Sequence, residues 1–126
     1  ISATVNIFHS RFIKKDRAKL EEEIIKFGKT YDKNGNLDKQ SGIWIATSIV
    51  EASLDIDFDY LFTELLDLNS LFQRFGRCNR KGAKNVTMYN CYVYTQLDEG
   101  DFILGNKGFI DKTIFELSNK AIHDIN

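Results

Sequence analysis

Short apolar runs recur along the chain and are separated by helical or polar stretches. The runs are rich in β-branched and aromatic residues, which is typical of buried strands. They are ATVNIF (3–8), GIWIAT (42–47), YLFTEL (60–65) and VTMYNCYVY (86–94). The sequence therefore predicts strands that are spread over most of the chain.

Between the first two predicted strands, apolar residues recur at the spacing of one helical face. Leu20, Ile24 and Phe27 stand at i, i+4 and i+7, opposite a surface of Glu and Lys residues. Asp16 can cap this helix at its start, and Gly28 can end it. Residues 28–42 are polar and rich in Gly and Asn, so they predict an internal loop.

Two further helices are predicted in the second half of the chain. One spans 70 to about 80, with Asn69 or Ser70 as its cap. Its buried stripe would hold Leu71, Phe75 and Cys78. The other is an additional C-terminal helix over 111–125, with one apolar face formed by Ile114, Leu117, Ala121 and Ile125.

This order of elements decides the fold class. Strands that alternate with helices indicate an α/β domain whose largely parallel sheet is flanked by helices. No internal repeat, low-complexity tract or second domain is evident in the 126 residues. No apolar run reaches the roughly 18 residues that a membrane span needs, so we expect no membrane partner and a cytoplasmic location.

Charge is distributed unevenly although the formal net charge is only −1. Residues 51–67 contain six acidic residues and no basic one, whereas residues 68–85 contain five basic residues and no acidic one. Cys78 and Cys91 are the two cysteines, too few for a disulfide framework or a cysteine metal cluster, which favours a reducing compartment. The local charge is therefore more informative than the net charge.

The basic stretch contains Arg74, Arg77 and Arg80, within seven residues. On a helix, Gln73, Arg77 and Arg80 would share one stripe, with no acidic residue on the same helix to neutralise it. A solvated cationic face is the simplest explanation. The guanidinium group, however, offers a rigid fork of donors that suits phosphate oxygens, so the residue type favours a phosphate ligand.

The preceding acidic stretch adds candidate groups at the carboxyl end of a strand. Thr47 and Ser48 place hydroxyls there, where ligands bind in open α/β sheets. Asp55 suits a ribose hydroxyl, whereas for Asp57 and Asp59 we favour a merely solubilising role in a turn.

The two stretches together resemble motifs V and VI of superfamily 2 helicases. QRFGRCNR is similar to the Q-R-x-G-R-x-x-R signature, and IATSIVEASLDIDFD and HSRF resemble segments of the CRISPR-associated helicase/nuclease of type I systems, the Cas-three family. The resemblance spans roughly residues 5–95. It implies a second RecA-like domain, a helicase C-terminal domain truncated at its N-terminus, because the strand and helix that open such a domain are missing before the first apolar run. The phosphate-binding loop and the D-E-x-H box do not occur here either, so the resemblance implies that they lie on a separate first domain. Many helicases have Gly where Asn79 stands.

The resemblance also implies roles for individual residues. Arg77 and Arg80 match the arginines that reach the γ-phosphate of ATP, and Gln73 matches a position that contacts this phosphate or the attacking water. Asp55 matches an acid near the ribose. Thr47, Ser48, Ser10 and Arg11 match or adjoin positions that grip a nucleic-acid backbone, here single-stranded DNA.

The implied enzyme is an ATP-dependent DNA helicase that needs further components. ATP would bind with Mg²⁺ between this domain and the first RecA-like domain of the same protein, which would supply the Mg²⁺ ligands, so the fragment alone is expected to be inactive. A CRISPR RNA-guided surveillance complex would recruit the protein. Two alternatives stay open: a nucleic-acid-binding module without an ATPase role, and a degenerate helicase-like domain that is kept for protein contacts.

Overall fold

Strands and helices alternate along the chain as the sequence predicts. A computed structural model describes residues 3–9, 14–51, 54–98 and 110–125. The elements, in chain order, are β1 (Thr4–Phe8), α1 (Lys14–Phe27), β2 (Gly42–Ala46), the 3₁₀ turn η1 (Ser48–Glu51), β3 (Leu61–Glu64), α2 (Leu68–Phe75), β4 (Cys91–Tyr94) and α3 (Lys112–Ile125). Among the described helices, none combines the length and apolar character that a membrane crossing requires.

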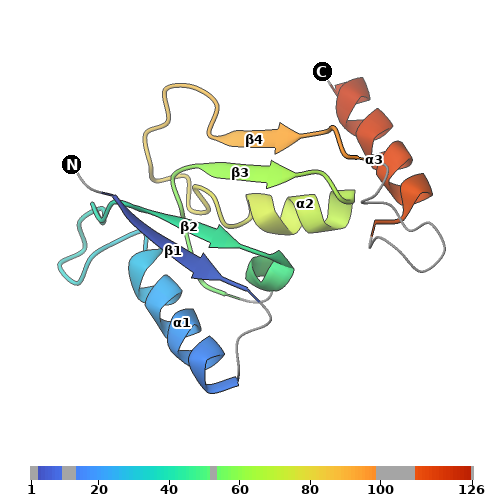
Figure 1. Cartoon of the computed structure of the whole chain (residues 1–126). Coiled ribbons are helices and arrows are strands. Elements are labelled where there is room, and N and C mark those ends of the chain that lie inside the picture. The colour runs from blue at the N-terminus through green and yellow to red at the C-terminus, as the bar shows by residue number, and fades with distance from the viewer. Residues whose placement is uncertain (1–2, 10–13, 52–53, 99–109, 126) are drawn as a thin grey trace.

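The strands form two parallel pairs, each built as a strand–helix–strand unit. β1 pairs with β2 in a register that places Val5 opposite Ile43, and β3 pairs with β4 in a register that places Phe62 opposite Tyr92. Helix α1 connects the first pair and α2 the second, and all four strands point the same way in Figure 1. The predicted α/β class with parallel strands is confirmed, although the described strands are hydrogen-bonded as two pairs rather than as one sheet.

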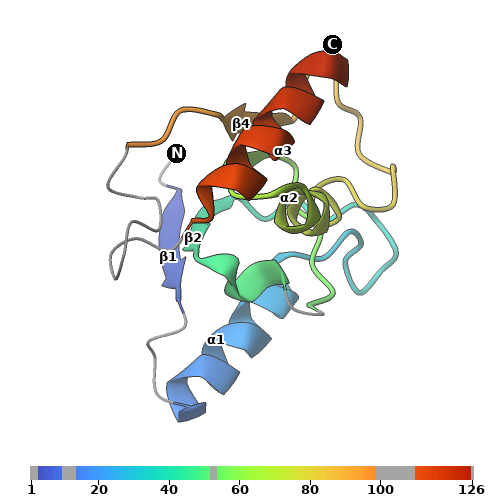
Figure 2. The same cartoon turned by 90° about the vertical axis from the view of Figure 1, so that its right-hand side faces the viewer.

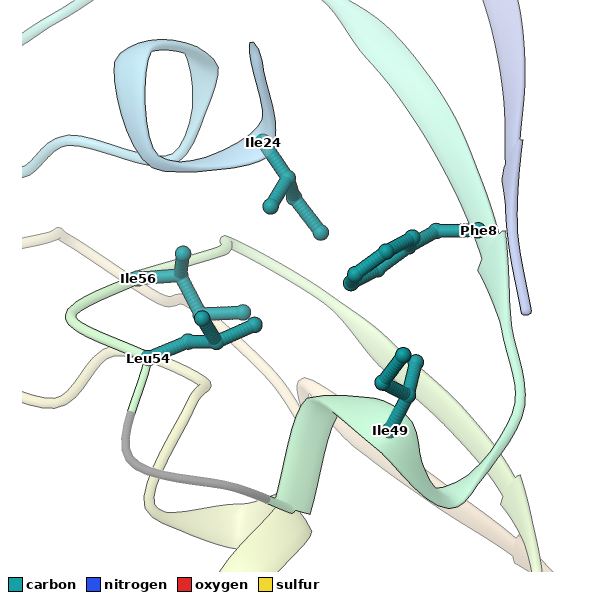
Figure 3. Packing of buried hydrophobic residues seen from close by; sticks show 5 residues of the cluster. All are labelled: Phe8, Ile24, Ile49, Leu54 and Ile56. Carbon is teal, nitrogen blue, oxygen red and sulfur yellow. The ribbon is translucent and has the colours of Figure 1, made fainter. Parts of the chain in front are cut away.

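The first core cluster lies between α1, the end of β1 and the segment after β2. Phe8, Ile24, Ile49, Leu54 and Ile56 point toward one another in Figure 3, and each is at most 8% exposed. The predicted apolar face of α1 is confirmed, because its Ile24 is buried in this cluster. Trp44 of β2 is half-buried and packs against the same cluster.

A second core cluster joins β3, α2 and α3. It consists of Leu65, Leu71, Ile110 and Phe115. Figure 2 shows α3 crossing in front of the other elements, beyond the carboxyl ends of β3 and β4 as seen in Figure 1.

The apolar face predicted for α3 is not the face that packs on the core. Ile114, Leu117 and Ile125 are 50%, 64% and 77% exposed, whereas Phe115 and Ser118 are buried. The helix carries apolar residues around much of its circumference, so the spacing alone did not select a face. The contact of the bulky Phe115 with the second core cluster selects it.

The last predicted strand is shorter than the sequence suggests. Residues 86–90 precede β4 instead of belonging to it, and Met88 and Tyr89 are 77% and 79% exposed. The reason is the partner strand: β3 begins at Leu61, which lies opposite Cys91, so earlier residues have no strand to pair with.

One face of each strand pair exposes apolar side chains. In the first pair, Val5, Ile7, Ile43 and Ile45 are all more than half exposed. In the second pair, the stacked rings of Phe62 and Tyr92 have centroids 4.9 Å apart and are 64% and 41% exposed. Parallel sheets are normally covered on both faces, so these surfaces are suited to burial against further protein.

The alternation along β1 leads to a test with a matched control. Phe8→Ala should destabilise the fold by about 3–5 kcal/mol, because it opens a cavity in the first core cluster. Ile7→Ala, on the exposed face of the same strand, should change the free energy of unfolding by about 0.5 kcal/mol or less. Urea unfolding followed by circular dichroism measures both. Equal losses for the two variants would contradict the assignment of faces.

Candidate functional site

Helix α2, which leads to the arginine-rich segment, begins and ends earlier than predicted. Its cap is Asp67, whose carboxylate accepts hydrogen bonds from the backbone N–H of Ser70 at 2.8 Å and from its hydroxyl at 3.0 Å. The helix ends at Phe75. The predicted helix therefore exists but stops before the predicted end at about residue 80, and the cap proposed at Asn69 or Ser70 is wrong.

Backbone pairing with another segment stops the helix. Phe58 donates its N–H to the carbonyl of Arg77 at 2.8 Å, and its carbonyl accepts from the N–H of Asn79 at 2.8 Å. These bonds use backbone groups that a continuing helix would need. Arg77 consequently lies in a turn and Arg80 in a loop, so the predicted helical stripe of Gln73, Arg77 and Arg80 does not exist.

Asn79 turns the chain between the two arginines. Its φ of 46° lies in the left-handed region, which Asn tolerates better than most residues and Gly better still. Its side chain also closes the loop, because its Oδ1 accepts from the N–H of Lys84 at 3.1 Å and its Nδ2 donates to the Lys84 carbonyl at 3.3 Å. The presence of Asn where many helicases have Gly thus has a conformational reason.

Arg74 is held inside the domain. Its Nε donates to Glu51 Oε1 at 2.8 Å, its Nη2 lies 2.7 Å from the same oxygen, and its Nη1 donates to Thr63 Oγ1 at 2.7 Å. The two charged side chains are only 12% and 16% exposed. Arg74 therefore fixes η1 against α2 and β3.

Arg77 also faces η1, but through backbone carbonyls. Its Nε donates to the Val50 carbonyl at 3.2 Å and its Nη2 to the Glu51 carbonyl at 3.5 Å. Burial first, and then the positive charge of Arg80, lower the pKa of Arg77, while Asp55 opposes this shift. Arginine stays protonated in proteins, so Arg77 remains a cation in a partly desolvated position.

Arg80 forms an ion pair with the acid that was expected to approach a ribose. Its Nη1 lies 2.8 Å from Asp55 Oδ1, and the side chains are 44% and 83% exposed. The sequence shows no acidic residue on the same helix to neutralise these arginines, but the fold supplies partners from other segments: Glu51 for Arg74, Asp55 for Arg80 and backbone carbonyls of η1 for Arg77. An exposed pair contributes only about 0–1 kcal/mol, so Arg80 and Asp55 can exchange partners at little cost.

The three aspartates after η1 differ in their surroundings. Asp55 is exposed, and Asp59 pairs with Lys84 at 2.6 Å and is 65% exposed. Asp57 is 5% exposed, and its carboxylate accepts from Thr30 Oγ1 at 2.6 Å and from the N–H of Arg80 at 2.8 Å. A solubilising role for Asp57 is therefore wrong.

The remaining candidates lie elsewhere around this centre. Thr47 and Ser48 are exposed where β2 leads into η1, and Gln73 is exposed on α2. Ser10 and Arg11 lie outside the described residues. The structure thus brings Arg80 and Asp55 together and places Arg77 on η1, whereas Gln73, Thr47 and Ser48 are exposed around them.

A shallow hollow that the sequence did not indicate lies beside Asp55. It has a volume of about 230 Å³ and is lined by residues from the end of α1 and the following loop, together with Asp55 and Lys81. Within the described residues, no group of three or more His, Cys, Asp or Glu side chains is arranged to hold a metal ion.

Cys78 is inert in this setting. Burial first, and then the neighbouring Cys91, raise the pKa of the Cys78 thiol to about 12. The thiol therefore stays protonated near neutral pH, and Cys78 is buried as predicted from its place beside Leu71 and Phe75.

Comparison with known proteins identifies the family. A family model described as CRISPR-associated nuclease/helicase Cas3, C-terminal, matches residues 1–83, which include the arginines, the acidic segment and η1. The chain belongs to this family. It is 41% identical over 80 residues to a CRISPR-associated endonuclease/helicase Cas3 from Escherichia coli and 31% identical over 126 residues to a Cas3 from Methanothermobacter thermautotrophicus. These matches cover 64% and 97% of this chain but only 9% and 14% of the two relatives.

Solved Cas3 structures share the fold. The chain superposes on T. fusca Cas3 with AMPPNP with a TM-score of 0.70 at 20% identity, covering 100% of this chain and 15% of that one. A second T. fusca Cas3 structure gives a TM-score of 0.64 at 25% identity, covering 91% of this chain and 13% of that one. The α/β fold is therefore that of the Cas3 RecA-like C-terminal region.

Two substitutions of Asn79 separate backbone conformation from side-chain bonding. Asn79→Ala and Asn79→Gly both remove the hydrogen bonds to Lys84, but only glycine adopts the left-handed conformation without steric cost. We expect Asn79→Ala to be less stable than Asn79→Gly by about 1–2 kcal/mol. Urea unfolding of the two variants measures this difference. A glycine variant as unstable as the alanine variant would show that the conformation at this position costs nothing.

Proposed function

We propose that this chain is part of an ATP-dependent single-stranded DNA translocase or helicase that acts in CRISPR interference. It would supply one wall of an ATP site whose other wall is the first RecA-like domain of the same protein. The observation that carries the proposal is the arrangement of Arg77, Arg80 and Asp55 in the segment matched by the Cas3 family model.

Arg80 is our choice for the residue that meets the transferred phosphoryl group. Its side chain is 44% exposed and is held by a weak ion pair. A triphosphate carries more negative charge than one carboxylate and accepts paired hydrogen bonds from a guanidinium, so it competes well for Arg80. Such an arginine accelerates phosphoryl transfer by about 10³–10⁵-fold. When Arg80 leaves it, Asp55 becomes available to a ribose hydroxyl.

Arg77 and Gln73 would complete the phosphate side of the site. Two carbonyl contacts with η1 restrain Arg77, and a restrained cation needs little reorganisation when charge develops. Gln73 is exposed on α2 and is assigned to the γ-phosphate or the attacking water. Mg²⁺ would bind ATP through ligands of the first RecA-like domain.

The DNA side of the proposal rests on the carboxyl end of β2. Thr47 and Ser48 are exposed there, and Thr47 N–H donates to the Phe8 carbonyl at 3.2 Å, which ties this end of β2 to the end of β1. Hydroxyls at the carboxyl end of a strand suit phosphate oxygens of a DNA backbone. Ser10 and Arg11, just after β1, are assigned to the same backbone.

The chain would act within a larger protein and a larger assembly. It spans 9–14% of the two Cas3 relatives, and each of its strand pairs exposes an apolar face. We assign the rest of the full-length protein to these faces, because parallel strands are normally covered on both sides. A CRISPR RNA-guided surveillance complex is the proposed recruiting partner. A simple DNA-binding module is less well supported, since Arg74 is held in a largely buried ion pair with Glu51.

Removing the Arg80 guanidinium tests the ATPase role. In the full-length protein, Arg80→Ala should lower the rate of ATP hydrolysis by about 10³-fold or more, because the developing phosphate charge loses its cation. ATP binding should change much less. Hydrolysis is measured by phosphate release and binding by equilibrium fluorescence with a labelled nucleotide.

The neighbouring Lys81→Ala removes an equal charge and serves as the control. The rate of ATP hydrolysis by the Lys81→Ala protein should remain close to that of the parent. Hydrolysis by Arg80→Ala within twofold of the parent would refute the proposed role.

A second substitution tests whether Thr47 contacts the DNA backbone. Thr47→Ala should weaken the DNA-stimulated part of ATP hydrolysis more than the basal part, because the hydroxyl is assigned to the DNA backbone and not to ATP. The comparison needs hydrolysis rates with and without single-stranded DNA in the full-length protein. Equal losses of both rates would count against a DNA-gripping role.

A further inference from the structure

The carboxylate of Asp57 is buried, and each of its oxygens accepts a hydrogen bond. Oδ1 accepts from the backbone N–H of Arg80 at 2.8 Å, and Oδ2 accepts from Thr30 Oγ1 at 2.6 Å. A carboxylate removed from water is costly unless it is hydrogen-bonded, so these two contacts are difficult to give up. The position of the Arg80 backbone is thereby tied to Asp57.

Asp57 is itself held firmly in place. Its N–H donates to the Gly28 carbonyl at 2.7 Å, and its carbonyl accepts from Lys84 Nζ at 2.6 Å. The end of α1 lies so close that a Cβ on Gly28 would be 2.9 Å from the Phe58 ring. Lys84 Nζ also lies 3.8 Å from Asp57 Oδ1, which helps to neutralise the buried charge.

The backbone of Arg80 is fixed, whereas its guanidinium can exchange partners. Asp57 holds the backbone N–H, and the left-handed Asn79 sets the direction of the chain before it. The guanidinium itself is held by the exposed Asp55. We propose that Asp57 is a positioning residue for Arg80, which fixes the backbone from which the guanidinium reaches the nucleotide. This inference rests on the proposed function of Arg80.

The expected effect follows from the geometry that phosphoryl transfer requires. A displacement of about 1 Å in a catalytic group can cost about 100-fold in rate. Asp57 touches neither the nucleotide nor the guanidinium in this proposal, so its loss should misplace Arg80 without removing a substrate contact. The rate constant kcat should fall while the KM for ATP changes little.

The test uses the full-length protein and two substitutions of one residue. Asp57→Ala should lower kcat for ATP hydrolysis by about 100-fold, with KM for ATP within about threefold of the parent. Asp57→Asn retains an oxygen that can accept from the Arg80 N–H, so it should recover most of the lost rate. The control is Asp59→Asn, which removes an exposed carboxylate two residues away and should leave kcat within about twofold. A folded Asp57→Ala protein with the parental kcat would overturn the inference.

A double substitution shows whether Asp57 acts through Arg80. In an Arg80→Lys background, which has already lost the guanidinium, Asp57→Ala should lower kcat by less than about threefold. The same 100-fold loss in both backgrounds would mean that Asp57 acts independently of Arg80, and would overturn the inference while leaving the proposed function in place. Parental hydrolysis by Arg80→Ala would instead overturn both.

Thr30 provides a second variant in case Asp57→Ala does not fold. Thr30→Val removes the contact with Oδ2 but leaves the Arg80 contact, so the carboxylate loses part of its restraint. We expect kcat to fall about tenfold with little change in KM, and Thr30→Ser to restore it. A folded Thr30→Val protein with parental kcat would contradict the positioning role.

Discussion

The candidate site depends on the pairing of residues 54–59 with residues 77–84. Phe58 exchanges backbone hydrogen bonds with Arg77 and Asn79, and the Asp57 carboxylate receives the N–H of Arg80. These contacts stop α2, turn the chain at Asn79 and bring the arginine-rich segment beside the acidic one. Because the acidic segment is also bonded to Gly28, the end of α1 supports the same arrangement. The site is thus a product of tertiary pairing rather than of one helix.

The spacing of apolar residues predicted the buried face of a helix correctly only where a single apolar face was available. The face of α1 was correct because Ile24 packs against Phe8, from the strand that precedes the helix. The apolar face predicted for α3 is not the buried one, because Phe115 packs in the second core cluster with Leu65 and Leu71, which are far away in the sequence. Spacing identifies possible faces of a helix, but tertiary contacts choose among them when apolar residues surround it.

For the candidate site, too, the sequence located the residues but not the tertiary contacts between them. The sequence located the arginines and the acidic residues, and the resemblance to a helicase family gave them roles that remain predictions. It could not show which charges pair, since Arg74 and Glu51 are separated by 23 positions and Arg80 and Asp55 by 25. Nor could the sequence show that Asp57 is buried while Asp55 and Asp59 are exposed. The hydrogen-bond partner of Asp57, Thr30, lies in a loop that only the fold brings near.

Burial, rather than the absence of a partner, distinguishes the arginine that can act on a ligand. The Arg74–Glu51 side chains are 12% and 16% exposed, and breaking a buried pair costs about 3–5 kcal/mol, so a ligand would gain little by competing for Arg74. The Arg80–Asp55 side chains are 44% and 83% exposed, and their pair contributes at most about 1 kcal/mol. A multiply charged phosphate can displace the carboxylate in the second case but not in the first. The ion pair of Arg80 is therefore compatible with a phosphate-binding role, because it holds the guanidinium beside the acidic segment and yields it readily to a stronger anion.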